Sequence, residues 1–260
     1  MLFFLISLLL TPAPSTTLSE QLVRETTASV LAKHKTDGVF IIYDEQQQRF
    51  LRSGGERSRA GFVPASTFKV PNSLIALAEG VVADEREVFV WDGVERQIAS
   101  WNQDQTLESA MRVSAVWTYQ HIAREVGRER MQMHLNELGY GNATIGDEVD
   151  TFWLDGSLLI SPQEQIHFLR RLHHNQLPFR QDHMDIVKRI LIRGEAGHRV
   201  LRGKTGWEVR TGNDQGWFVG YVTDESKVWF FALHVDIYAD GPGKDREGIA
   251  KEILAGLSLW

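Results

Sequence analysis

Cysteine is absent from this chain of 260 residues. Its absence excludes disulfide bonds, a thiolate nucleophile and any cysteine-ligated metal. The nine histidines do not replace it, because none of them lies in an H-E-x-x-H or comparable ligand pattern, even where His173 and His174 are adjacent. We therefore expect no metal site.

Long apolar runs are also scarce. The most apolar stretch, residues 2–10 with Ser7 as its one polar residue, is too short to cross a bilayer comfortably, and prolines and small residues follow it at 12–15. We interpret residues 1–15 as a secretory signal peptide, with cleavage near residues 13 to 17 and a buried N-terminal strand as the alternative. The mature chain is then expected to be periplasmic and, without a cysteine to carry lipid, free of the membrane.

Clustered positive charge is the third absence. Lys and Arg number 28 against 34 Asp and Glu, a net charge of −6, and no long basic run occurs, so a nucleic-acid partner is not expected. A hydrophobic fraction of 43% and a charged fraction of 24% are typical of a globular protein. The length suits one large domain or two intertwined lobes, and either a monomer or a homodimer is compatible with it.

Hydrophobic periodicity predicts elements of both kinds. Residues 18–34 have helical spacing, and residues 38–54 read as two strands around a polar turn. A helix is expected from Ser66 to Gly80, and residues 81–185 are mostly helical in pattern. The clearest helical patterns there are residues 108–127, 128–139 and 161–176.

The last third of the chain changes character. Aromatic and β-branched residues separated by turn residues predict three antiparallel strands between residues 199 and 238, and a closing helix follows Gly243. We predict an α/β fold in which one antiparallel sheet, built from both chain ends, is flanked by the terminal helices, with a mainly helical lobe beside it. Residues 16–260 then form a single domain, whose α/β lobe comprises about 16–65 and 190–260 and whose helical lobe comprises about 66–189.

One candidate for chemistry is the pair Ser66 and Lys69, which precedes an apolar run. Residues three apart share one face of a helix, and Pro71 is tolerated only near a helix start, so both should lie in the first turn. A lysine can activate a serine only if burial lowers its pKa far below about 10.4. The alternative is a serine cap followed by a solvated lysine.

Two further motifs follow in order. Ser114-Ala115-Val116 lies in the helical region, and Lys204-Thr205-Gly206 lies among the strands. The order S-x-x-K, S-x-x and K-T-G is typical of serine β-lactamases and penicillin-binding proteins, although their middle motif is often S-D-N. With Tyr140-Gly141-Asn142, Phe152-Trp153-Leu154 and Lys204 to Trp207, the chain resembles the class D serine β-lactamases, or oxacillinases, over nearly all of its mature length.

The resemblance implies a hydrolase that opens the β-lactam ring of penicillins and related antibiotics and confers resistance to them. Ser66 is implied as the nucleophile that forms an acyl-enzyme, and Lys69 as the general base for both half-reactions, carrying a carbamate (N6-carboxylysine) formed with carbon dioxide. Trp153 would donate its indole N–H to that carbamate. Ser114 would relay a proton to the leaving nitrogen. Apart from carbon dioxide or bicarbonate, no cofactor is implied.

The resemblance also assigns substrate contacts. The backbone N–H groups of Ser66 and Trp207 would form the oxyanion hole. The carboxylate of the substrate would be bound by Lys204, Thr205 and Arg246. Further substrate contacts would come from Val116, Leu154, Gly206 and Trp207. For Arg246 a solvated position at the start of the last helix is the alternative.

Three other functions remain open at this point. A β-lactam sensor would acylate without hydrolysis, but such domains follow a larger membrane segment. A DD-peptidase would be expected to carry S-x-N as its middle motif. A catalytically inactive relative is disfavoured by the presence of Ser66, Lys69, Ser114, Trp153 and Lys204.

Overall fold

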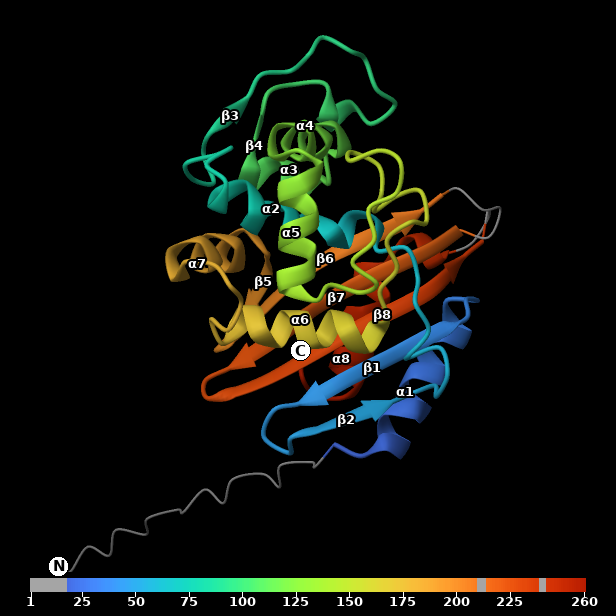
Figure 1. Cartoon of the computed structure of the whole chain (residues 1–260). Coiled ribbons are helices and arrows are strands. Elements are labelled where there is room, and N and C mark those ends of the chain that lie inside the picture. The colour runs from blue at the N-terminus through green and yellow to red at the C-terminus, as the bar shows by residue number, and fades with distance from the viewer. Residues whose placement is uncertain (1–17, 210–213, 239–241) are drawn as a thin grey trace, which may run out of the picture.

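The sheet is the frame of the molecule. The computed structural model describes residues 18–209, 214–238 and 242–260, so the expected signal peptide lies outside it. Six antiparallel strands follow the order β2-β1-β8-β7-β6-β5 (Figure 1). They are β1 (Gly38–Asp44), β2 (Arg49–Arg52), β5 (Ile192–Ala196), β6 (Arg199–Glu208), β7 (Asp214–Asp224) and β8 (Lys227–Ile237). The prediction of one sheet built from both chain ends is confirmed, and only β5 was not predicted.

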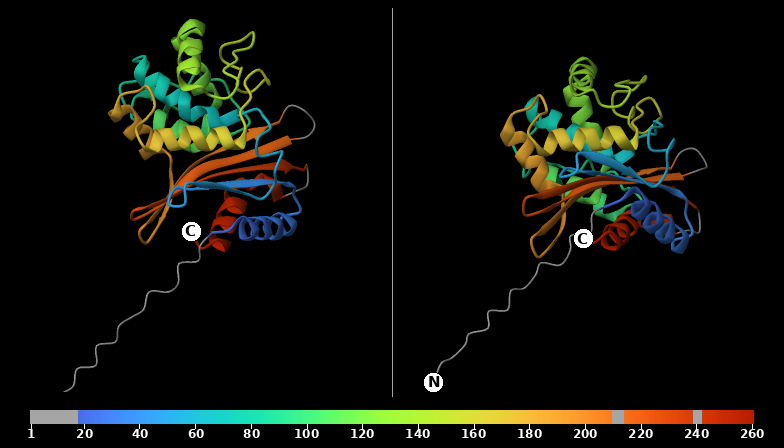
Figure 2. Two further views of the ribbon diagram at one scale, coloured as in Figure 1. Left: turned by 60° about the horizontal axis from the view of Figure 1, so that its bottom comes forward. Right: turned by 90° about the horizontal axis from the view of Figure 1, so that it is seen from below.

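Both faces of this sheet are covered. Helices α1 (Glu20–Lys33) and α8 (Arg246–Gly256) pack on one face, and α6 (Pro162–His173) lies across the other (Figure 2). Side chains alternate between two cores: Phe40 and Ile42 of β1 join the core beneath α1 and α8, whereas Ile41 joins the core on the helical side. Burial of both faces explains why the strands read as nearly continuous apolar runs.

The remaining helices form the upper layer in Figure 1. They are α2 (Lys69–Ala78), α3 (Leu107–Val113), α4 (Val116–Val126), α5 (Arg128–Leu138) and α7 (Gln181–Ile190). The helix expected at 161–176 is confirmed as α6, which ends at His173. Ser161 and Glu164 form a reciprocal capping box at its start.

The prediction that residues 81–185 are mostly helical was wrong for two stretches. Residues 79–106 hold only the short pair β3 (Val88–Phe89) and β4 (Gln105–Thr106) and the 3-10 turn η2 (Ala99–Trp101), and residues 139–161 form no helix. In the first stretch Asp84, Asp92 and Asp104 accept hydrogen bonds from backbone N–H groups. Such local bonds compete with those of a helix.

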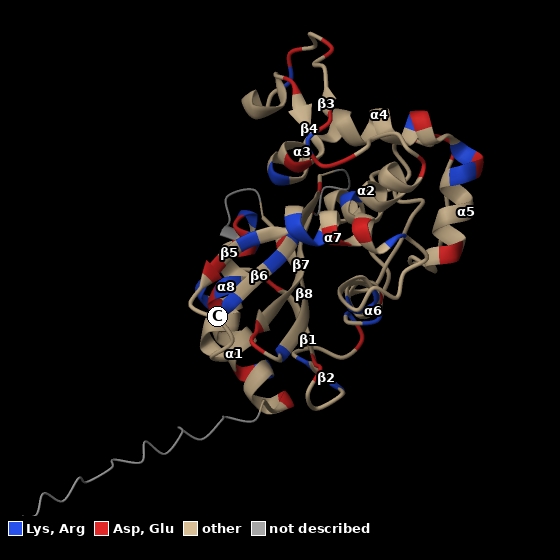
Figure 3. Ribbon diagram, turned by 90° about the vertical axis from the view of Figure 1, so that its left-hand side faces the viewer, with Lys and Arg blue, Asp and Glu red and all other residues tan. Residues whose placement is uncertain are grey.

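Charge is spread over the surface. Figure 3 shows acidic and basic residues interspersed over the elements in that view. Within the described residues, no helix has the length and apolarity that a membrane crossing requires. Across the same residues, no group of three or more metal-ligating side chains comes together.

Candidate active site

The segment that carries Ser66 turns sharply before the helix. Residues Ala65–Phe68 form a 3-10 turn, η1, and α2 begins only at Lys69, so the prediction that both residues lie in the first α-helical turn was wrong in detail. Ala65 has a φ of 47°, a left-handed conformation rarely adopted by a residue other than glycine. Its N–H donates to the carbonyl of Trp153 at 3.0 Å, which holds the turn in place. Pro71 is the third residue of α2, where its missing N–H breaks no helical bond.

Ser66 and Lys69 nevertheless meet. Lys69 Nζ donates to Ser66 Oγ at 3.0 Å, and the lysine is completely buried. Burial lowers the pKa of Lys69 to about 7, because the charged form loses its hydration. The alternative of a solvated lysine is therefore excluded. A neutral amine in contact with a serine hydroxyl is the arrangement that general-base activation requires.

A second serine–lysine pair lies in the same site. Lys204 Nζ on β6 donates to Ser114 Oγ at 2.7 Å, and Lys204 is 2% exposed. Burial, and then the positive charge that nearby Lys69 carries when it is protonated, hold the pKa of Lys204 well below its usual value. Ser114 has a φ of 62° and ends α3, so the predicted helix over residues 108–127 is in fact two helices that meet at this residue. The break turns the hydroxyl of Ser114 toward β6.

These groups open into a cleft of about 430 Å³ with a mainly apolar lining. Of the residues predicted to act at the substrate, Lys204 is buried and does not line this cleft. The others do line it: Ser66, Ser114, Val116, Leu154, Thr205, Gly206, Trp207 and Arg246. Gly206 is required there, because a Cβ would lie 2.9 Å from the carbonyl oxygen of Pro64 and would force β6 away from η1. Ile98 also lines the cleft and was not predicted, since no motif marks its irregular segment.

Two residues at the site, Trp153 and Arg246, carry buried donor atoms that have no partner among the described residues. Trp153 is fully buried and stacks on Phe68 at 5.3 Å, yet its indole Nε1 makes no hydrogen bond. Arg246 leaves Nε and Nη1 unpaired while its guanidinium lies 5.1 Å from the ring centre of Trp207. Unpaired buried donors cost free energy, so these two points in the site are candidates for contact with an acceptor from outside the protein chain.

The Y-G-N motif supports the wall that carries Trp153. Asn142 donates from its backbone N–H to the carbonyl of Leu159 at 2.9 Å and from Nδ2 to that of Ser157 at 2.9 Å. Gly141 has a φ of +57°, and a Cβ there would collide with the backbone of Leu159. The motif therefore acts through structure, by fixing the loop after Phe152.

Comparisons with known proteins agree with this geometry. Residues 27–255 match the penicillin binding protein transpeptidase domain. β-Lactamase OXA-48 from Klebsiella pneumoniae is 45% identical over 223 residues, which are 85% of this chain and 84% of that protein. Among solved structures, the class D β-lactamase YbXI from Nostoc has a TM-score of 0.87 at 40% identity and covers 90% of this chain and 99% of its own. A class D β-lactamase from Bacillus subtilis has a TM-score of 0.83 at 43% identity over 88% and 95%.

The fold and the two serine–lysine pairs place the chain among the penicillin-binding transpeptidase-type domains. Within them, it belongs to the class D β-lactamases.

Proposed function

We propose that the protein hydrolyses the amide bond of the β-lactam ring through an acyl-enzyme on Ser66. The observation that carries this proposal is the contact of 3.0 Å between Nζ of the buried Lys69 and Ser66 Oγ, with the pKa of Lys69 at about 7. The names of the similar proteins, which are β-lactamases of class D, support the same reaction.

In acylation, Lys69 in its carboxylated form removes the proton of Ser66 as Oγ attacks the lactam carbonyl. The C–N bond breaks, and Ser114 passes a proton to the leaving nitrogen, with Lys204 at 2.7 Å to restore it. The backbone N–H groups of Ser66 and Trp207 would hold the oxyanion, an interaction often worth a few kcal/mol.

Deacylation requires a base that activates water, and the residues around Lys69 fit its carboxylated form. A buried neutral amine is the form that attacks carbon dioxide, and the unpaired N–H of Trp153 is a donor suited to an anionic oxygen. A carbamate on Lys69 would supply that anionic oxygen as the base of both steps. Trp153 would hold it, and Val116 and Leu154 would keep bulk water away.

The carboxylate of a β-lactam would bind at Arg246. This residue offers unpaired N–H groups, and Thr205 and Gly206 line the same cleft. Lys204, on β6, adds positive charge when it is protonated.

We also propose that residues 1–15 direct secretion to the periplasm and that residues 16–260 act as one domain, with an α/β lobe of about 16–65 and 190–260 and a helical lobe of about 66–189. The mature enzyme would then meet β-lactams as a monomer or homodimer, detached from the membrane. A mature N-terminus sequenced from periplasmic extract, and found between residues 13 and 17, would support export.

Turnover of a chromogenic cephalosporin, with and without bicarbonate, tests the reaction. The enzyme should turn over many equivalents, Ser66→Ala none, and Lys69→Ala should acylate slowly without deacylating. A stable acyl adduct on the unaltered protein would instead identify a sensor. Full steady-state turnover by Lys69→Ala would refute the role of Lys69 as the base.

A further inference from the structure

One rim of the cleft is formed by an irregular segment, residues 91–104, here called the strap. It places Ile98 and Trp101 on the cleft, and Ile98 is 46% exposed. Because the Proposed function assigns the lactam carbonyl to Ser66 and the carboxylate to Arg246, this apolar rim is left for the acyl side chain of the substrate. An apolar rim on an irregular segment discriminates between substrates only if something fixes its position.

Arg96 closes the part of the strap that carries this rim. Its backbone N–H donates to Asn102 Oδ1 at 2.8 Å, and its carbonyl accepts from Asn102 Nδ2 at 2.9 Å. Both backbone groups of one residue are therefore tied to a single side chain six residues later. The loop between them contains Ile98 and Trp101.

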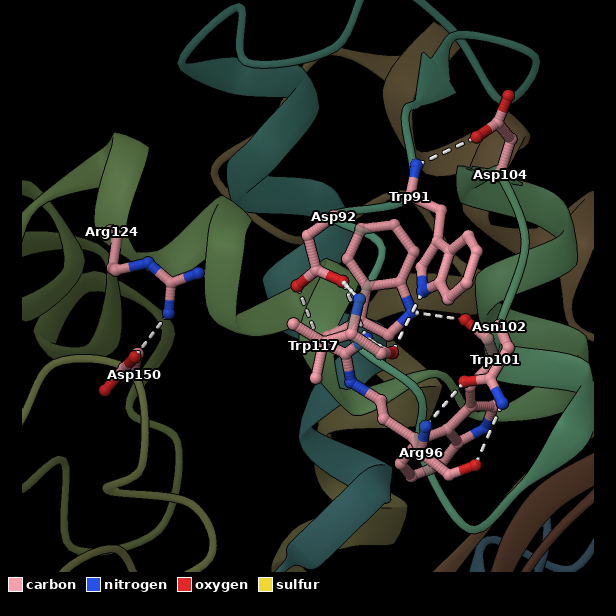
Figure 4. Close-up of polar contacts among 10 residues, drawn as sticks. Trp91, Asp92, Arg96, Trp101, Asn102, Asp104, Trp117, Arg124 and Asp150 are labelled. Carbon is pink, nitrogen blue, oxygen red and sulfur yellow. Dashed lines mark hydrogen bonds and ion pairs between the residues drawn. The ribbon is translucent and has the colours of Figure 1, made fainter.

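The side chain of Arg96 joins this loop to α4. Its guanidinium makes two bonds to Asp92, at 2.8 and 2.6 Å, and lies 5.4 Å from the ring centre of Trp117 (Figure 4). The indole N–H of Trp117 donates to the carbonyl of Trp101 at 3.0 Å. The guanidinium is thus held between a carboxylate of the strap and an aromatic ring of α4.

Trp101 extends the connection to the residue beside Ser114. Its indole N–H donates to the carbonyl of Val113 at 3.0 Å, and Val113 immediately precedes Ser114. Arg96 itself does not line the cleft. Its contacts therefore lead to the rim without reaching the substrate.

From these contacts we propose that Arg96 is a positioning residue that fixes the rim of Ile98 and Trp101 and thereby sets the preference for β-lactams with bulky apolar acyl side chains. The proposal rests on the Proposed function, since it concerns the substrates of that same site. Loss of the guanidinium would loosen the loop and lower the affinity for a bulky side chain. The chemistry at Ser66 would continue.

The experiment compares Arg96→Ala with the matched control Arg124→Ala. Arg124 also pairs with an aspartate, Asp150, and the pair lies away from the strap in Figure 4. The substrates are a penicillin with a large aromatic acyl side chain and the bare penicillin nucleus. We expect Arg96→Ala to lower kcat/KM about fivefold on the penicillin with the aromatic side chain, because part of an apolar contact is lost. On the bare nucleus the loss should be less than about twofold. Arg124→Ala should change neither.

An equal loss on both substrates, or no loss on either, would overturn the proposal. Asn102→Ala provides a second variant, because it opens the same loop without removing a charge, and it should show the same selectivity. Hydrogen exchange of the amides of residues 96–102 gives a readout apart from turnover. Faster exchange is expected in Arg96→Ala and in Asn102→Ala but not in Arg124→Ala, and unchanged exchange in Arg96→Ala would refute the positioning role. If the unaltered protein hydrolyses neither penicillin, the Proposed function fails, while the exchange result still decides the role of Arg96.

Discussion

Replacing Trp153 by Phe tests the function of its unpaired indole N–H. The change removes one donor from a fully buried site and keeps an aromatic ring against Phe68. A hydrogen bond to a charged group contributes about 1.5–3 kcal/mol, and 1.4 kcal/mol is tenfold in an equilibrium constant. The carbon dioxide concentration that half-carboxylates Lys69 should therefore rise about tenfold to a hundredfold.

The loss of stability should be small by comparison. A smaller ring costs about 1–2 kcal/mol in lost packing, but the deleted N–H has no partner to leave unsatisfied. The assay is carbon-13 NMR of the protein titrated with labelled bicarbonate, which detects the carbamate directly, beside steady-state turnover at the same concentrations.

Trp217→Phe is the matched control. Trp217 is equally buried, but its indole N–H already donates to the carbonyl of Val63 at 2.9 Å. This variant should lose more stability, because it leaves a buried carbonyl unpaired, and keep its affinity for carbon dioxide. Equal shifts in the two variants, or no shift in Trp153→Phe, would refute the assignment of the Trp153 donor.

Three other predictions address the lysine, the arginine and the fold. Because the pKa of Lys69 is about 7, acid populates the ammonium form, which cannot react with carbon dioxide. At a fixed low concentration of carbon dioxide, turnover should fall about tenfold per pH unit well below pH 7 and recover with added bicarbonate, and a flat profile from pH 5 to 8 would contradict this. Arg246→Ala should cost about tenfold or more in kcat/KM on a β-lactam carboxylate and little on its methyl ester, whereas equal losses would exclude carboxylate binding. Ser161→Ala should lower the free energy of unfolding by about 1 kcal/mol in denaturant titrations without changing activity, and unchanged stability would contradict the capping role.

The sheet and terminal helices could be predicted because their patterns are local. Neighbouring strand residues such as Phe40 and Ile41 point to opposite faces of the sheet and are both apolar, and Ser161 with Glu164 predicts a helix start. Ser66, Lys69 and Lys204 could be selected because their spacing and order are fixed by the chemistry they share. Neither inference needs knowledge of distant contacts.

The features that were missed depend on such contacts. Residues 108–127 have helical periodicity throughout, and nothing in them reveals that Ser114 breaks the helix to meet Lys204 across 90 residues. The strap is held by Asn102 and Asp92 through bonds to backbone and guanidinium, which have no apolar period. The unpaired state of Trp153 is likewise a property of its surroundings, since an isolated sequence does not show which partners are missing.

The site combines several features that oppose stability. Ala65, which precedes Ser66, and Ser114 itself adopt left-handed backbone conformations. A left-handed conformation costs a residue other than glycine about 1–2 kcal/mol. Lys69 and Lys204 are buried amines, and protonation of either one raises the free energy of the folded state. Glycine would relieve the backbone strain but would remove the Ser114 hydroxyl, and an apolar residue in place of either lysine would remove a proton acceptor. Substitutions that stabilise these positions should therefore lower activity, and the two sheet cores must supply the stability that the site lacks.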